Sequence, residues 1–362
     1  MPSPAFAGEG WVRVFFLFDA AWRESDRCKT LTPTLSRESG RGSIGGMTWR
    51  MAEPSGISII CCYIGAMLKT DQSVDPIPPE GAAADWTVPQ AWDSYSAADH
   101  ATWDRLFARQ TALLPGRVVP AFLEGIELAG LDRPGIPDFA ELSDRLMKAT
   151  GWQVLAVPGL VPEEVFFEHL ANRRFVAGRF IRAPDQLDYL QEPDIFHDVF
   201  GHVPLLAHPA FADYMQAYGQ GGLRALEQGA IERLARLYWY TVEFGLIRDE
   251  SSGNGGLKLY GAGIVSSYGE SIFALDDPSP NRLGFDLRRV MRTRYRIDDY
   301  QQNYFVIDSF DDLLRQTIET DFSPLYREIA TQPDFEPGDV VPTDVVITNG
   351  TQAYAKEKAA EA

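Results

Sequence analysis

Two histidines and a glutamate are the residues of this chain whose types and spacing best suit metal chemistry. The 362 residues include only five histidines, and His197 and His202 lie in one stretch, Asp-Ile-Phe-His-Asp-Val-Phe-Gly-His-Val-Pro. Glu243 follows within an apolar, aromatic segment. Two histidines and one carboxylate hold Fe(II) in non-haem oxygenases, because this set leaves positions on the metal open for dioxygen. We therefore predict His197, His202 and Glu243 as metal ligands.

The five-residue spacing of the histidines restricts the local backbone. Residues five apart on an α-helix point about 140° away from each other. Gly201 favours a helix end and Pro204 disfavours its continuation, so we expect His202 to leave the helix and turn back toward His197. The histidines of His-Glu-x-x-His zinc proteases lie one turn apart instead. The three other histidines are expected to be hydrogen-bonded core side chains: His100, His169 and His208.

Glu243 has helical neighbours that are apolar or aromatic, and no Lys or Arg stands within one turn of it. A carboxylate buried in such surroundings costs several kcal/mol unless it meets a cation or is protonated. A metal ion would supply the cation. The alternative is a buried glutamate with a raised pKa or a distant arginine partner.

Three motifs, in this order, make the chain recognisable. They are Glu-Pro-Asp-Ile-Phe-His-Asp-Val-Phe-Gly-His-Val-Pro-Leu-Leu, Tyr-Trp-Tyr-Thr-Val-Glu-Phe-Gly-Leu, and Tyr-Gly-Ala-Gly-Ile-Val-Ser-Ser-Tyr-Gly-Glu. The sequence resembles the pterin-dependent aromatic amino acid hydroxylases, and most of all their short bacterial members that act on phenylalanine. The resemblance runs from Asp85 to Leu325. It implies an enzyme that converts L-phenylalanine into L-tyrosine with O2, Fe(II) and tetrahydrobiopterin or a related bacterial tetrahydropterin.

The resemblance also implies roles for residues around the metal. Arg182 matches the arginine that binds the substrate carboxylate, a task that suits a bidentate guanidinium. Ser266 matches a serine near the metal ligands and the substrate, and Glu270 is expected as an acceptor behind the ligands. Trp239 and Pro193 match positions that line the pocket for the amino acid ring. Ordinary core packing is the alternative for these last two.

Pterin binding is implied for the stretch Val-Pro-Gly-Leu-Val-Pro-Glu-Glu-Val-Phe-Phe, residues 157–167. Its backbone amides would reach the pterin edge, and a phenylalanine would stack on the pterin face. The spacing from Arg182 favours Phe166 over Phe167. The expected pterin residues are Gly159, Leu160, Phe166, Tyr238 and Asp198.

Composition agrees with an enzyme that acts on a small molecule. The chain is 45% hydrophobic with a formal net charge of −18, which is unfavourable for nucleic acids and anionic membranes. All three cysteines lie before residue 67, at Cys28, Cys61 and Cys62. The cysteine-free remainder favours a reducing, cytoplasmic location.

The charge distribution suggests four segments. Residues 1–66 carry seven basic and six acidic residues, whereas the remainder carries 26 and 45. We expect translation to begin at Met67, with a disordered extension as the alternative for 1–66. An N-terminal arm (67–84), a single catalytic domain (85–333) and a flexible acidic tail (334–362) would follow.

The catalytic domain is predicted to be mainly α with a few short strands (α+β). Helices are expected over 97–114 and 139–150, in a segment that begins at Pro209 and ends at 219–222, and over 223–247, followed by an extended segment at 258–265. Residues 334–362 lack a long heptad-patterned helix, and no regulatory domain of usable length precedes the catalytic region. We therefore expect a monomer without feedback regulation by substrate.

Other functions stay open at this point. The same motifs serve tryptophan and tyrosine hydroxylases. A zinc hydrolase can also use two histidines and a glutamate. A 2-oxoglutarate oxygenase normally shows His-x-Asp, whereas Asp198 directly follows His197. A non-catalytic binding protein would have no need for a metal site with open positions.

Overall fold

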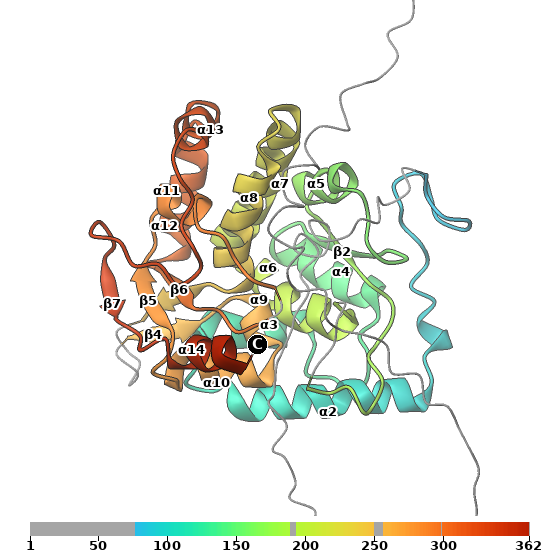
Figure 1. Cartoon of the computed structure of the whole chain (residues 1–362). Coiled ribbons are helices and arrows are strands. Elements are labelled where there is room, and N and C mark those ends of the chain that lie inside the picture. Colours follow the sequence, from blue (N-terminus) through green and yellow to red (C-terminus); the bar gives the residue numbers. More distant parts are fainter. Residues whose placement is uncertain (1–76, 189–192, 250–255, 298, 362) are drawn as a thin grey trace, which may run out of the picture. The chain divides into compact units, whose positions relative to one another are not determined.

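The computed structural model describes residues 77–188, 193–249, 256–297 and 299–361 (Figure 1). Residues 1–66, for which a late translation start or a disordered extension is expected, lie outside these ranges. Helices dominate and the strands are short, as the sequence predicts. Within the described ranges, no helix combines the length and the apolar character needed to cross a membrane.

The helices follow one another along the whole described chain. Their bounds are α2 (Ala97–Leu113), α3 (Pro120–Ala129), α4 (Phe139–Ala149), α5 (Glu163–Ala171), α6 (Val203–Leu206), α7 (Pro209–Glu227), α8 (Ile231–Tyr238), α9 (Ala262–Val265), α10 (Tyr268–Asp276), α11 (Leu287–Met291), α12 (Phe310–Glu319), α13 (Phe322–Ala330) and α14 (Ala353–Glu361). Two π-helices, η3 (Phe196–His202) and η4 (Trp239–Glu243), and a short 3-10 helix, η2 (Trp92–Ser94), complete the set.

The strands form two sheets. Strands β1 (Gln153–Ala156) and β2 (Arg174–Ala177) pair in parallel. The larger sheet has the order β4-β3-β6-β5-β7, with parallel pairs in its centre and an antiparallel strand at each edge. Its strands are β3 (Leu246–Arg248), β4 (Leu257–Leu259), β5 (Asn281–Gly284), β6 (Asn303–Ile307) and β7 (Val346–Thr348).

Local sequence explains where several helices begin. Ser96 and Asp99 form a capping box at the start of α2, in which the Asp99 amide donates to Ser96 Oγ at 3.2 Å. Asp138 caps α4, and Pro209 occupies the first turn of α7. The predicted helices over 97–114 and 139–150 are confirmed within one residue at their ends.

Helix α7 runs through the glycines at which the sequence predicts its end. A Cβ at Gly219 would lie 2.4 Å from the backbone nitrogen of Ala171, and one at Gly222 would lie 2.0 Å from the Phe167 ring. These glycines therefore allow α5 to pack closely on α7 rather than ending the helix. The prediction of an end at 219–222 was wrong for this reason.

The segment predicted as one helix over 223–247 is divided. α7 ends at Glu227, Gly229 adopts a φ of 63°, and α8 continues into η4 before β3 begins at Leu246. The predicted extended segment over 258–265 is also only partly correct, because its second half forms α9.

Residues 334–361, predicted as a flexible tail, contain a strand and a helix that the sequence analysis does not anticipate. β7 pairs with β5, and Arg289 holds Asp344 through a buried ion pair with Nε–Oδ1 at 2.9 Å. Tyr354 of α14 packs on Phe273 with ring centroids 5.3 Å apart. This stretch therefore contacts the sheet and α10.

Candidate metal centre

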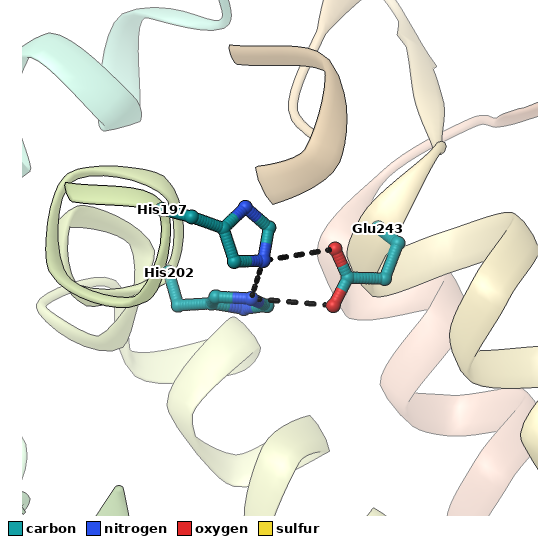
Figure 2. A group of neighbouring side chains, drawn as sticks. All are labelled: His197, His202 and Glu243. Carbon is teal, nitrogen blue, oxygen red and sulfur yellow. Dashed lines mark hydrogen bonds and ion pairs between the residues drawn. The ribbon is translucent and has the colours of Figure 1, made fainter. Parts of the chain in front are cut away.

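The three predicted ligands converge in the structure (Figure 2). His197 and His202 lie on η3, and Glu243 is the last residue of η4. The Nε2 atoms of the two rings are 3.4 Å apart. His202 Nε2 lies 3.2 Å from Glu243 Oε1, and His197 Nε2 lies 3.8 Å from Glu243 Oε2. All three side chains are buried.

The π-helix explains how residues five apart face one point. Its hydrogen bonds run from residue i to i+5, so each turn is wider than an α-helical turn and residues five apart lie nearly above one another. His202 therefore stays in the helix, and α6 follows with Pro204 in its first turn. The expectation that the chain leaves the helix between Gly201 and Pro204 was wrong, because it assumed an α-helical turn.

Ser266 fixes the orientation and the tautomer of His197. The Ser266 hydroxyl donates to the Ala262 carbonyl at 2.7 Å, so its oxygen is left to accept from His197 Nδ1 at 3.0 Å. The proton then sits on Nδ1, and the lone pair of Nε2 points toward Glu243. Burial lowers the pKa of His197 to about 4, partly offset by the negative charge of Glu243, so the imidazole is neutral at pH 7.

His202 is held mainly by aromatic rings. The Phe175 ring lies 5.0 Å from the His202 ring, and the Tyr238 ring lies nearly parallel at 6.3 Å. Among the described residues, His202 Nδ1 has no hydrogen-bond partner. Its plane is thus set by packing, with Nε2 directed at His197 and Glu243.

The ligand set fits a first-row divalent metal ion. Neighbouring ligands of one such ion stand about 3 Å apart when each is about 2 Å from the metal, and two of the three measured separations are 3.2 and 3.4 Å. The Nε2 atoms of the two imidazoles face each other, and a cation bound between them and Glu243 would accept both nitrogen lone pairs. The donor chemistry suits Fe(II) and Zn²⁺ alike.

The guanidinium of Arg182 lies beside this group and is already paired. Its Nε and Nη2 donate to the two carboxylate oxygens of Asp194, each at 2.8 Å, and its backbone amide donates to Oδ2 at 2.9 Å. Asp194 Oδ1 also accepts the backbone amide of His197 at 3.1 Å. One buried carboxylate therefore orients Arg182 and caps the helix that carries both histidines.

The two residues predicted to face the substrate ring are buried, and each lies four residues before a predicted ligand. Trp239 lies one turn before Glu243 on η4, and its indole stacks on Tyr295 at 4.1 Å. Pro193 immediately precedes Asp194 and is buried.

The predicted pterin residues fall in two groups. The first is aromatic: Phe166 contacts Tyr238 edge to face at 6.3 Å, and Tyr238 in turn faces the His202 ring. Phe167 points instead toward Tyr218 of α7, with ring centroids 5.8 Å apart. Of the two phenylalanines, Phe166 is thus the one on the side of the metal ligands.

The second group consists of the backbone at Gly159 and Leu160 and the carboxylate of Asp198. Gly159 and Leu160 are partly exposed, and a Cβ at Gly159 would meet nothing within 4 Å, so its backbone borders open space. Asp198 accepts the Gly178 amide at 2.7 Å. Burial raises the pKa of Asp198 to about 7 despite this hydrogen bond.

Glu270 makes its side-chain hydrogen bonds to residues other than the three predicted ligands. Its Oε1 accepts the Tyr304 hydroxyl and the Gln301 backbone amide, the latter at 3.4 Å. Burial raises the pKa of Glu270 to about 8 against these hydrogen bonds. One of these hydrogen bonds leads to Gln301, whose side chain accepts from Trp239.

Comparisons with known proteins identify the family. Residues 87–332 match the family model described as biopterin-dependent aromatic amino acid hydroxylase. The chain belongs to this family. The hydroxylase chain is 61% identical to the phenylalanine-4-hydroxylase of Caulobacter vibrioides over 278 residues, which cover 77% of this chain and 93% of that protein. It is 60% identical to the phenylalanine-4-hydroxylase of Ralstonia nicotianae over 282 residues, covering 78% and 88%.

Solved structures of the same kind share the fold of this hydroxylase. The phenylalanine hydroxylase of Chromobacterium violaceum bound to cobalt matches with a TM-score of 0.70 and 58% identity, over 73% of this chain and 94% of that one. The predicted mainly α architecture with short strands is therefore confirmed.

Sequence reasoning missed two residues that contact the predicted site residues. Asp194 stands three residues before His197, which is the spacing of an N-cap, and that signal could have found it. Gln301 lies 58 residues beyond Glu243 in a segment without a motif, and no sequence signal connects it to Trp239.

Proposed function

We propose that this chain is a phenylalanine 4-monooxygenase that forms L-tyrosine from L-phenylalanine, O2 and a tetrahydropterin at a non-haem Fe(II) site. The observation that carries the proposal is the convergence of His197, His202 and Glu243 from two π-helices. A chain about 60% identical to phenylalanine-4-hydroxylases over most of their length supports the choice of substrate. The proposed catalytic domain, residues 85–333, coincides closely with the matched range 87–332.

His197, His202 and Glu243 would hold the metal. Fe(II), together with the reduced pterin, supplies the activation of dioxygen for insertion into the aromatic ring. The chain's own part is to aim Nε2 of both histidines at one point. Ser266 does this for His197 by fixing its tautomer, and the Phe175 and Tyr238 rings set the plane of the His202 ring.

Substrate binding is assigned to one charged and two apolar side chains. Arg182 would bind the carboxylate of the amino acid with its remaining guanidinium N–H groups, since five donors are present, Asp194 takes two of them and the Leu187 carbonyl takes one. Trp239 and Pro193 would enclose the ring. Removal of water from this pocket strengthens the Arg182 contact.

Pterin binding is assigned to the side of His202. The backbone at Gly159 and Leu160 would lie along the ring edge, and Phe166 and Tyr238 would offer aromatic surface. Asp198 would hydrogen-bond the polar edge of the pterin.

The first test is tyrosine formation by the full chain with Fe(II), O2 and a tetrahydropterin, each omitted in turn. Glu243→Gln removes one ligand charge at almost constant shape and is expected to abolish tyrosine formation and weaken metal binding. The matched control is Glu328→Gln, whose carboxylate is exposed on α13 and pairs with Arg288. It should leave both measurements unchanged.

The same assay separates the remaining functions. Product from tryptophan or tyrosine, with little from phenylalanine, would move the proposal to another substrate within the family. Bound zinc without oxygen consumption would favour a hydrolase and contradict the proposal.

We further propose a cytoplasmic monomer that binds neither nucleic acid nor membranes. The net charge of −18 and the absence of cysteines after Cys62 support this. Sedimentation equilibrium should give the mass of one chain, and a stable tetramer would contradict the proposal.

A further inference from the structure

Trp239 is confined by stacking and by one directional bond. Its indole is 1% exposed and lies nearly parallel to Tyr295, with an interplanar angle of 13°. The Phe244 ring lies 4.7 Å away. Stacking alone lets a ring slide in its own plane. The hydrogen bond from Trp239 Nε1 to Gln301 Oε1, at 2.9 Å, removes that freedom.

Gln301 can present only its oxygen to the indole. Its Nε2 donates to the carbonyls of Arg296 and Asp299, at 3.1 and 3.3 Å. An indole N–H can only donate. If the Gln301 amide were flipped, its NH2 group would face the Trp239 N–H, and its oxygen would face the two backbone carbonyls, so no hydrogen bond could form at either end. Gln301 is only 3% exposed, so water could not supply a hydrogen bond to a group that lost its partner there.

The backbone of Gln301 is held from two sides. Its amide donates to Glu270 Oε1, which also accepts the Tyr304 hydroxyl. On the other side, Tyr354 of α14 donates from its hydroxyl to Asp299 Oδ1 at 2.7 Å. Gln352 Nε2 donates to the Gln302 carbonyl at 3.2 Å.

The C-terminal part of the chain thus reaches Trp239 through a short series of direct contacts. Tyr354 and Gln352 hold residues 299–302, and Gln301 within them holds the indole. Both contacting residues lie beyond 87–332, the range that matches the family model. Trp239 is one turn from Glu243 on η4, so a shift of the indole would act directly beside the metal ligands.

We propose that Gln301 is a positioning residue that fixes the Trp239 indole as a wall of the substrate ring pocket and so sets the affinity for the aromatic amino acid. The inference rests on the proposed function in one respect, namely that Trp239 faces the substrate. Tyr354 assists by securing the segment that carries Gln301.

Gln301→Met tests this directly, because methionine keeps the length of the side chain and loses both kinds of hydrogen bond. The first readout does not depend on activity. The indole N–H resonance of Trp239 in the Zn²⁺-loaded full chain is identified by its loss in Trp239→Phe, and its hydrogen exchange is measured. Loss of one buried hydrogen bond should speed exchange by about 10-fold.

The second readout is kinetic. Gln301→Met is expected to raise KM for phenylalanine by about 5- to 10-fold, with KM for the pterin unchanged and kcat changed less. In the Trp239→Phe background the same substitution should change KM for phenylalanine by less than about 2-fold, since its partner is gone. Tyr354→Phe should shift the same two quantities in the same direction by about 2-fold.

Gln216→Leu serves as the control, because Gln216 is also bonded at both ends of its amide, to Arg173 and to the Ala171 carbonyl, on α7. It should affect thermal stability without affecting KM for phenylalanine. Equal increases in both Michaelis constants, or an undiminished effect of Gln301→Met in Trp239→Phe, would overturn the proposal. If the wild-type chain hydroxylates no aromatic amino acid, the proposed function fails, and the exchange rates still decide whether Gln301 fixes the indole.

Discussion

The two histidine ligands belong to regions that are held in different ways. Around His197 the contacts are polar: Ser266 accepts from its ring, and Asp194 accepts its backbone amide and pairs with Arg182. Around His202 the contacts are aromatic and come from Phe175 and Tyr238. The polar region fixes a tautomer and a charge balance, whereas the aromatic region fixes only the plane of a ring.

This difference has consequences for substitutions. Removing a polar partner from a buried site leaves the other group without a hydrogen bond, so the full cost of burying that group lowers the free energy of unfolding. An aromatic side chain makes many weak contacts around a ring, and losing some of them has a correspondingly small energetic effect. Substitutions near His197 should therefore cost stability or metal in large steps, and those near His202 should change ligand affinity moderately.

Asp194→Asn should have the largest effect. The side chain of Asp194 is fully buried and that of Arg182 is 9% exposed, so the substitution leaves a guanidinium without its counter-charge. We expect the free energy of unfolding to fall by about 3 kcal/mol. Relative to wild type, KM for phenylalanine should rise more than KM for the pterin. Urea denaturation and steady-state kinetics measure these.

Asp213→Asn provides the comparison for Asp194. The carboxylate of Asp213 pairs with Arg173 and is 48% exposed, so its loss should cost less than about 1 kcal/mol. If both variants lost the same free energy of unfolding, the buried pair near His197 would stabilise the fold no more than an exposed pair does.

Ser266→Ala comes next in size. Without the hydroxyl, His197 Nδ1–H loses its acceptor and the Nε2 lone pair is no longer held toward the other ligands. We expect metal affinity to fall by about 10- to 100-fold, measured by competition with a chelator. Ser271→Ala is a matched control, because Ser271 is also buried and donates to the Ile264 carbonyl. A similar fall in both variants would argue against a specific role of Ser266.

The candidate metal ligands could be chosen from the sequence, but their geometry could not. Few histidines, a short spacing and a glutamate in an apolar segment suffice to choose His197, His202 and Glu243. The π-helix escaped prediction because its turn is wider than that of the α-helix from which the spacing was interpreted. Pro204 predicts a break, yet the helix continues from η3 into α6 with Pro204 as the second residue of α6.

Contacts between distant segments explain most of what the sequence did not reveal. The glycines at 219–222 resemble a helix end, and only the position of α5 shows that they are needed for close packing. β7 is an edge strand of three residues whose pairing depends on β5, about 60 residues earlier. The Gln301–Trp239 bond likewise depends on the fold of the larger sheet.

Phe166→Leu examines the aromatic region. Leucine keeps apolar volume but removes the flat face, so KM for the tetrahydropterin should rise by about 3- to 10-fold while metal affinity stays unchanged. Phe167→Leu is the adjacent control, because Phe167 packs on Tyr218 and α7. It should lower the free energy of unfolding without changing KM for the pterin. A reversed result would exchange the roles of the two phenylalanines.

Asp334→Asn asks whether polar contacts away from the metal ligands act on folding alone, and it should have the smallest effect. Burial alone would raise the pKa of Asp334, but Arg236 and Arg233 outweigh burial and lower the pKa to about 2. A carboxylate with a depressed folded pKa stabilises the fold above its unfolded pKa, and this stability is lost as the pH falls through the folded pKa.

The wild-type advantage over Asp334→Asn should thus be about 1 kcal/mol at pH 7 and shrink as the pH falls from about 4 toward 2. Urea denaturation in the presence of a chelator measures it without a contribution from metal release. Asp308→Asn, whose carboxylate is 76% exposed beside Arg248, should change the free energy of unfolding at pH 7 by less. An altered metal affinity in Asp334→Asn would contradict this separation, because it would connect the ion pairs between Asp334 and α8 to the candidate ligands on η3 and η4.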